Sequence, residues 1–513
     1  MRIKCHIGQY RVAVKCPLHA TLHAKSLAME NRVPDADSRR CGSDVPALPP
    51  LVSLALILLL ASVLLWMPRP AATTAQSWRL LVIFVCTIAA MMLRPMPTGA
   101  VVLTGLVVAV LAKVFTISQA LSAYASGTVW LVITAFFIAR VLIRTGLARR
   151  IALLFVSLIG HTSLGLGYSM VLSDLVLGSI IPSNGARVGG ALFPITRTVA
   201  TIYDSLPGRT AALLGSYLML VLYQGDVIVC AMFLTGQAGN PIGARLAEQV
   251  AHVPMTWSSW LYAASVPGLA ALALAPWIIY LLHPPEIKHT PRAAEMARQE
   301  LRKMGRVGRD EMVAAGVFVL VCGLWATSSL HGIETTTIAL LGVAALLLTG
   351  TLSWTDAMQE HVGWDTFVWY GGMIRLGEGL YEFGLTGALA TWVSGALSGW
   401  SWPVLTVVVI LVYFFIHYGI ASITTHFVSL YPPFLSVLLA AGAPAPLVAY
   451  AMAFFTNLSA SLTHYGTTPA PIIFAAGYVS HGTWWRLGLI LAFANLTVWT
   501  LIGLLWWKYV GLW

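Results

Sequence analysis

The sequence predicts an all-α polytopic membrane protein whose two halves repeat each other. Hydrophobic residues make up 58% of the 513 residues and charged residues only 10%, and the mean hydropathy is +0.81, values that no ordinary soluble domain has. Apolar runs such as residues 51–67 and 260–282 are long enough for a helix to cross a bilayer, which takes roughly 20 residues. These runs show no strict alternation of apolar and polar residues, which excludes a membrane-spanning barrel.

Basic residues are concentrated in two stretches, and this distribution predicts the orientation in the membrane. The formal net charge is +11; eight basic residues lie in residues 1–50, seven lie in the loop 284–311, and only three follow residue 311. The positive-inside rule places both basic stretches in the cytoplasm. The charge therefore indicates topology, and no nucleic-acid partner is expected.

Residues 1–50 are expected to form a disordered basic tail. The tail has no apolar run, which excludes a secretory signal peptide, and residues 1–28 contain no acidic residue. A transit peptide and an over-extended start, with Met29 as the true first residue, are the two interpretations. The remaining chain divides into a first transmembrane helix with the first repeat (51–283), a basic cytoplasmic loop (284–311) and a second, inverted repeat (312–513).

Residue spacing reveals the repeat. Three pairs share an offset of 239 positions, namely Ser183 with Ser422, Pro194 with Pro433, and Trp130 with Trp369. Two further pairs, Gly236 with Gly466 and Pro241 with Pro471, share an offset of 230. One crossing separates the cytoplasmic tail from the first repeat, whereas the second repeat follows a cytoplasmic loop directly. The two repeats therefore have opposite orientations, which brings equivalent segments together near the bilayer centre.

Two polar segments interrupt the apolar runs, "SIIPSNGARVGGALFPI" (179–195) and "GIASITTHFVSLYPPFL" (419–435). Pro182 and Gly185 favour a broken helix, and backbone in lipid must then line a cavity enclosed by protein. The start of the next helix offers free N–H groups, which favour anions. Short side-chain donors lie at these breaks and at a later one, namely Ser183, Asn184, Ser422, Thr424, Thr425, Thr467 and Thr468, before Pro469. The expected ligand is a small carboxylate anion.

Arg187 and His426 are equivalent at the offset of 239, so each half places a potential cation beside its break. An arginine at the membrane centre costs roughly 2.5–3.5 kcal/mol, which favours a function or a partner. A dianion bound to two protein cations meets this requirement. Asp174 and Asp226 either carry protons or, as is more common for buried carboxylates, pair locally. Arg375 and Glu378 are expected to neutralise each other on one helix.

The segments "PSNGARVGGALFPI", "FLTGQAGNPI", "ASITTHFVSLYP" and "SLTHYGTTPAP" resemble the signature segments of the divalent anion/sodium symporter family. The resemblance runs from about residue 75 to the C-terminus and is strongest to the dicarboxylate antiporter branch, which includes 2-oxoglutarate/malate translocators and citrate/succinate antiporters. It implies eleven transmembrane helices, two re-entrant hairpins whose tips meet at the substrate, a homodimer formed through a scaffold part, and an elevator-type movement.

The resemblance also implies the site residues. Ser183, Asn184 and Gly185 would form one hairpin tip, and Ser422, Ile423 and Thr424 the other. The remaining substrate-binding candidates are Arg187, His426, Thr467, Thr468 and Pro469. Gly185 and Ile423 depart from the family's usual Ser-Asn-Thr tips, and Thr468 departs from the usual Gly-Thr-Gly-Pro. No metal ligand, cofactor or catalytic residue is predicted.

We therefore expect a sodium-independent exchanger of small di- or tricarboxylates, of the malate, 2-oxoglutarate, succinate and citrate class. It would lie in the lipid bilayer of a bacterial inner membrane with its N-terminus in the cytoplasm. A sodium-coupled dicarboxylate symporter is the alternative. An anion channel and an intramembrane hydrolase that uses Ser422 and His426 are more remote, and for the hydrolase the sequence offers neither an orienting acid nor an oxyanion hole.

Overall fold

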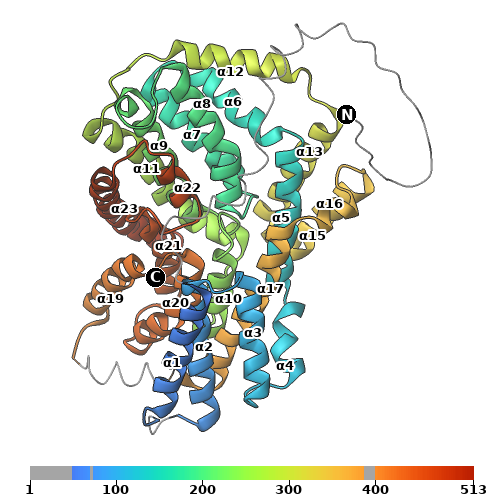
Figure 1. Cartoon of the computed structure of the whole chain (residues 1–513), viewed down its shortest axis with the longest axis vertical. Coiled ribbons are helices and arrows are strands. Elements are labelled where there is room, and N and C mark those ends of the chain that lie inside the picture. Colours follow the sequence, from blue (N-terminus) through green and yellow to red (C-terminus); the bar gives the residue numbers. More distant parts are fainter. Residues whose placement is uncertain (1–48, 70–72, 386, 388–398) are drawn as a thin grey trace, which may run out of the picture. The chain divides into compact units, whose positions relative to one another are not determined.

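The computed structural model describes residues 49–69, 73–385, 387 and 399–513 (Figure 1). The expected basic tail, except for its last two residues, lies outside this part of the chain. The described residues form helices joined by short turns, and the single bridge of strand type joins Thr162 to His289. The predicted all-α membrane fold is confirmed.

In the described part of the chain, seven helices are long and apolar enough to cross a membrane. They are α2 (Ala75–Leu93), α5 (Gly127–Arg144), α9 (Gly215–Met232), α11 (Trp257–Leu282), α19 (Trp402–Ile416, continued to Gly419 by the 3-10 turn η4), α20 (Ile423–Ala440) and α23 (His481–Tyr509). Four shorter apolar helices join them, α1 (Pro50–Trp66), α3 (Thr98–Leu111), α7 (Ser163–Gly178) and α15 (Thr335–Leu348). Together these helices fit the expected count of about eleven.

The other helices connect or cover these. They are α4 (Ile117–Leu121), α6 (Leu147–Ile159), α8 (Phe193–Ile202), α10 (Asn240–Ala251), α12 (Pro291–Met304), α13 (Arg309–Ala326), α14 (Ser328–His331), α16 (Trp354–Met358), α17 (His361–Glu382), α21 (Ala445–Leu458) and α22 (Pro469–Ala475). Short 3-10 turns are η1 (Ser122–Ala125), η3 (Ala211–Leu213) and η5 (Ser459–Ser461), and η2 (Gly185–Leu192) is a π-helix.

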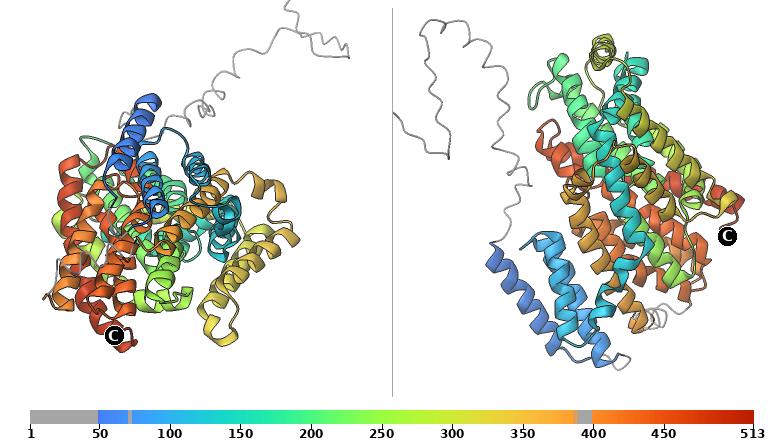
Figure 2. Two further views of the ribbon diagram at one scale, coloured as in Figure 1. Left: turned by 90° about the horizontal axis from the view of Figure 1, so that it is seen from below. Right: turned by 90° about the vertical axis from the view of Figure 1, so that its right-hand side faces the viewer.

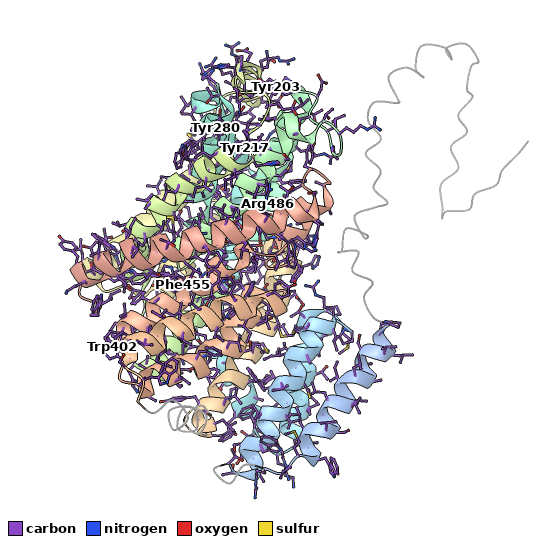
Figure 3. The ribbon with its side chains drawn as sticks, turned by 90° about the vertical axis from the view of Figure 1, so that its left-hand side faces the viewer. Tyr203, Tyr217, Tyr280, Trp402, Phe455 and Arg486 are labelled. Carbon is purple, nitrogen blue, oxygen red and sulfur yellow. The ribbon has the colours of Figure 1, made fainter. Side chains whose placement is uncertain are left out.

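Helix α9 forms the centre of the packing around the site. All its 18 residues are buried, including Gln224 and Asp226, and it packs against α7, α8, α11 and α21. The basic loop contributes α12, which lies across α6 (Figure 1). Helices α1, α2 and α3 lie side by side (Figure 2). Helix α23, which carries Arg486, runs along α21, which carries Phe455 (Figure 3). A polar group on α9 therefore has to find its partners inside the protein.

Each of the two predicted breaks interrupts a helix, and the same local hydrogen bond is found at both. Helix α7 ends at Gly178, and a non-helical stretch leads into η2 and α8; α19 ends at Ile416, and a turn leads into α20. The Ser183 hydroxyl accepts from the N–H of Ala186 at 3.2 Å, and the Ser422 hydroxyl accepts from the N–H of Thr425 at 3.3 Å. These donors and acceptors correspond at the offset of 239, so the repeat seen in the sequence extends to backbone geometry.

Candidate functional site

Asn184 at the first tip connects the two halves of the protein. Its Nδ2 donates to the hydroxyl of Thr467 at 2.7 Å and to Oδ2 of Asp226 at 3.3 Å. Gly185 lies against Thr468, because a Cβ atom at position 185 would be 2.7 Å from the Thr468 methyl carbon. The first tip thus meets the break that precedes α22.

The second tip reaches the same break through its histidines. Nε2 of His417, in the turn that precedes the tip, is 3.1 Å from the carbonyl oxygen of Gly466. Nδ1 of His417 is 3.0 Å from Nδ1 of His426, on the first turn of α20. Hydrogen bonds therefore link both tips to residues 466 and 467, and the structure brings together most of the residues predicted for one site.

The predicted site residues divide into those that solvent reaches and those that are buried. Ser183, Gly185, Ser422 and Thr424 are partly exposed, and Thr468 is exposed. Arg187 and His426 have no exposed surface. Ile423 and Pro469 are also buried, so Ile423 can offer a ligand only its backbone. An anion that enters from solvent meets hydroxyls and backbone N–H groups first, and the two potential cations lie behind them.

Arg187 uses all five of its N–H donors within the protein. Nε donates to Oδ1 of Asp174, and Nη2 donates to Oδ1 of Asp226 at 2.6 Å and to the sulfur of Cys230 at 3.6 Å. Nη1 donates to the carbonyl oxygens of Ile181 and Gly236, at 2.9 and 2.8 Å. A guanidinium group has five donors, so none is left for a ligand.

This geometry gives Arg187 another role than the one expected. The Arg187 side chain anchors the first tip inside the protein: it bonds to α7 through Asp174, to α9 through Asp226, and to the turn that follows α9 through the carbonyl oxygen of Gly236. Asp174 and Asp226 pair locally with it, which is the commoner of their two interpretations. Direct binding of substrate by Arg187 stays a prediction, and the geometry does not support it.

His426 is held as a neutral imidazole. The 3.0 Å gap between the two Nδ1 atoms has room for one hydrogen. Because Nε2 of His417 faces a carbonyl oxygen and must donate, Nδ1 of a neutral His417 accepts and Nδ1 of His426 donates. Nε2 of His426 is buried and has no partner among the described residues, so a proton there, which a positive charge would require, would have no acceptor. The expected positive charge at His426 is absent in this arrangement.

The two halves fill equivalent space with different residues. His417 corresponds to Gly178 at the offset of 239, and a Cβ atom at Gly178 would lie 3.5 Å from Cζ of Arg187. In the first half, the long side chain of Arg187 packs over Gly178. In the second half, the rings of His417 and His426 stack at the corresponding position, with centroids 5.1 Å apart. His417 was expected to be structural, although the same offset pairs it with Gly178 beside the first tip.

Other polar groups near the break brace the backbone. The Tyr223 hydroxyl donates to the carbonyl oxygen of Ala460, and Nε2 of Gln224 donates to that of Ser461 at 2.9 Å. Both residues lie on α9, so the second half's break rests on the first half's central helix. Their sequence signal, polar residues two to three positions before Asp226 in an apolar run, was available.

Three expectations remain. Arg375 pairs with Glu378 at 3.6 Å, as predicted, and more closely with Glu382 at 2.6 Å. The Ser422 hydroxyl and the His426 ring, which the hydrolase interpretation would join, share no hydrogen bond among those of the described residues; only their backbones are bonded, with the His426 N–H donating to the Ser422 carbonyl oxygen at 3.1 Å. Within the described part of the chain, no group of three or more His, Cys, Asp or Glu side chains is placed to hold a metal ion.

Comparison with known proteins gives one family and several relatives. The family model described as the sodium:sulfate symporter transmembrane region matches residues 50–513. The putative malate transporter YflS of Bacillus subtilis is 42% identical over 464 residues, which cover 90% of this chain and 97% of that protein. The chloroplastic dicarboxylate transporter 1 of Arabidopsis thaliana is 38% identical, with 98% of this chain and 92% of that protein covered.

Two further proteins match over nearly their whole length. The inner membrane protein YbhI of Escherichia coli is 33% identical, covering 90% of this chain and 98% of that protein. Among solved structures, the antimetabolite efflux pump MtrF of Neisseria gonorrhoeae has a similar fold, with a TM-score of 0.52, 14% sequence identity and coverage of 91% of this chain and 96% of MtrF.

Proposed function

The chain belongs to the sodium:sulfate symporter family and is a membrane transporter, not an enzyme, and on that premise we propose that it exchanges small di- or tricarboxylates by alternating access. Relatives that share 38–42% of their residues with it are named as malate or dicarboxylate transporters, which supports this substrate class. We propose a homodimer in a bacterial inner membrane with a cytoplasmic N-terminus and an elevator-type movement of the tips.

The observation that carries the proposal is the partly exposed, hydroxyl-rich meeting point of the two halves. Ser183, Ser422, Thr424 and Thr468 are accessible there. No acceptor is found for the backbone N–H groups of Ile423 and Thr424 among the hydrogen bonds of the described residues. Free N–H groups at the start of an 18-residue helix, α20, favour an anion. A substrate with two carboxylates can engage hydroxyls and N–H groups from both halves at once.

The oxygen atoms around the guanidinium group of Arg187 support sodium independence. Its guanidinium lies among two carboxylate oxygens and the carbonyl oxygens of Ile181 and Gly236. Oxygen atoms of this kind are the ligands that hard cations prefer. We propose that the arginine fills the place of a bound cation with a charge that cannot leave.

Unpaired cations are not the physical basis of the proposed exchange. Unpaired cations in an emptied site would hinder its return, but Arg187 is paired with Asp174 and Asp226 and His426 is neutral. Instead, the emptied tips leave N–H groups without acceptors, and burying such groups costs on the order of 1–3 kcal/mol each. A second carboxylate removes this cost, so return with substrate is faster than return without it.

Counterflow in proteoliposomes tests the proposal. Uptake of labelled malate, succinate, 2-oxoglutarate and citrate is measured with and without unlabelled substrate inside, in sodium and in choline buffers. We expect uptake to need internal substrate and to be equal in the two buffers. Strong accumulation into empty vesicles under a sodium gradient would establish the sodium-coupled symporter instead, and uptake that internal substrate does not accelerate would indicate a channel.

A further inference from the structure

The cluster around Arg187 contains one cation and two carboxyl groups, all buried. The exposed side-chain fractions of Arg187, Asp174 and Asp226 are 0%, 1% and 0%. If both carboxyl groups were ionised, the cluster would carry one uncompensated negative charge without water around it. An unpaired buried charge is strongly unfavourable, and such groups usually become neutral instead.

One oxygen of the cluster is without a donor. Oδ1 of Asp174 and Oδ1 of Asp226 accept from Arg187, and Oδ2 of Asp226 accepts from Asn184. Oδ2 of Asp174 is buried and has no hydrogen-bond partner among the residues that the structure describes. A carboxylate oxygen in this position carries the negative charge least well, so it is the atom at which a proton would be held.

The ionisable neighbours leave the charge uncompensated. Asp174 lies on α7, which packs against α6, α9, α11 and η2. The groups that interact with it electrostatically are Arg187 on η2 and Asp226 and Cys230 on α9. The basic residues of α6 are engaged elsewhere, since Arg149 and Arg150 pair with Glu300 and Glu311. The ionisable residues of α11 are Tyr262 and Tyr280, and a tyrosine side chain cannot supply a positive charge.

A second cluster, around Arg375 on α17, shows the contrast. Arg375 also faces two carboxylates, Glu378 and Glu382. Glu378 pairs in addition with Arg245 at 3.2 Å, and the Glu382 side chain is 50% exposed, so a second cation and water compensate their charges. The Arg375 cluster can therefore keep two ionised carboxylates, whereas the Arg187 cluster lacks that compensation.

We propose that the Asp174–Arg187–Asp226 cluster is a proton-binding site, with one proton on Oδ2 of Asp174. The two tips change their access from one side of the membrane to the other only when this proton is bound. The proton comes from solvent and converts one carboxylate to a neutral carboxylic acid, so the cluster has no net charge. The proposal rests on the proposed carboxylate exchange, because a bound dianion near Asn184 would repel an additional negative charge in this cluster. Loss of the proton at alkaline pH then slows exchange.

Infrared spectroscopy of the purified protein in lipid detects the proton directly. Wild type at neutral pH should show the carbonyl stretch of a protonated carboxylic acid, and labelling the aspartate side-chain carboxyl with carbon-13 should shift it. Asp174 and Asp226 are the two buried aspartates of the described residues, so the labelled band reports on this pair. Absence of a shifted band in wild type would overturn the proposal, whether or not any variant folds.

Exchange as a function of pH provides the second test. Malate is ionised at both carboxyl groups above neutral pH, so its own charge is constant over the alkaline range. Wild-type exchange should fall there, and Asp174→Asn, which retains an acceptor for Nε of Arg187 but has no proton to lose, should remove most of that fall and the labelled infrared band. Glu382→Gln in the exposed cluster is the matched control and should keep the wild-type profile.

The outcomes separate this proposal from the proposed function. If no carboxylate is exchanged at any pH while the infrared band is present, the proposed function fails and the proton site stands. If wild type exchanges malate and Asp174→Asn shows the same alkaline fall, the coupling of the proton to movement is overturned.

Discussion

Gly185 and Thr468 complement each other across the two halves of the protein. A Cβ atom at Gly185 would lie 2.7 Å from the methyl carbon of Thr468 and 3.3 Å from its Cβ. These are two of the three positions at which the chain departs from the family pattern, which has threonine at the first and glycine at the second. The side chain missing from the tip is thus replaced by one on the facing break.

This relationship predicts the effect of exchanging the two residues. Gly185→Thr alone should reduce counterflow several-fold, because the introduced threonine side chain would clash with Thr468. The double variant with Thr468→Gly should recover most of the rate. Gly190→Ala is the control, since a Cβ atom there meets nothing within 4 Å. A double variant that is as slow as the single one would show that the two positions are not coupled.

Arg187→Ala should destabilise the fold as well as stop transport. The change leaves two buried carboxyl groups without their cation, and breaking a buried ion pair in this way costs roughly 3–5 kcal/mol. Arg187→Lys should recover only part of this, because an ammonium group cannot replace the planar fork. Thermal unfolding in lipid nanodiscs measures the effect.

Arg245→Ala is the matched control for Arg187. Arg245 is 37% exposed and pairs with Glu378, so its removal should cost about 1 kcal/mol or less. Equal unfolding temperatures for Arg187→Ala and wild type would contradict the anchoring role and favour the original assignment of Arg187 as a substrate ligand.

The histidine pair predicts inhibition by acid. A further proton on the neutral pair has two places to go. On Nδ1 of His417 it would face the N–H of His426 across 3.0 Å and open the contact between the second tip and Gly466, and on Nε2 of His426 it would be a buried N–H without an acceptor among the described residues. Substrate affinity should therefore fall as the pH drops, and not as it rises. His417→Gln and His426→Gln should show a smaller acid effect.

His283→Gln is the control for the pair. His283 contacts the hydroxyl of Ser216 at 2.7 Å, outside the two tips. Its variant should keep the wild-type response, and comparison among variants removes the titration of the substrate itself. An unchanged acid response in both His417 and His426 variants would exclude the pair as its source.

The bond between Asn184 and Thr467 should contribute to the closure of the site. Thr467→Val keeps the shape of the side chain but removes the acceptor of the 2.7 Å bond, so we expect a loss of about 1 kcal/mol, or several-fold in affinity. Thr463→Val is matched to it, because the buried Thr463 hydroxyl has no partner in the structure. Counterflow at varied malate concentration measures both. If the two variants lose affinity equally, the bond has no specific role.

The sequence determined the class of the protein and the location of its candidate site. Composition requires a membrane environment, and helix breaks in an apolar chain need an enclosed polar cavity, so residues 183–185 and 422–424 stand out without any structure. The constant offset of 239 also identified Arg187 and His426 as equivalent positions. These signals are local or periodic, and a single chain contains them in full.

Only the tertiary structure decided the charge of the site. Whether a buried arginine or histidine faces a ligand depends on which side chains from other helices lie within hydrogen-bonding distance, and these partners lie 13 and 39 residues from Arg187 and 9 residues from His426. In the protein interior, where the polarity is low, a charged group is strongly stabilised by an opposite charge beside it and strongly destabilised without one. Spacing along the chain therefore located the two potential cations, and packing showed that Arg187 is paired with two carboxyl groups and that His426 is buried beside a second histidine.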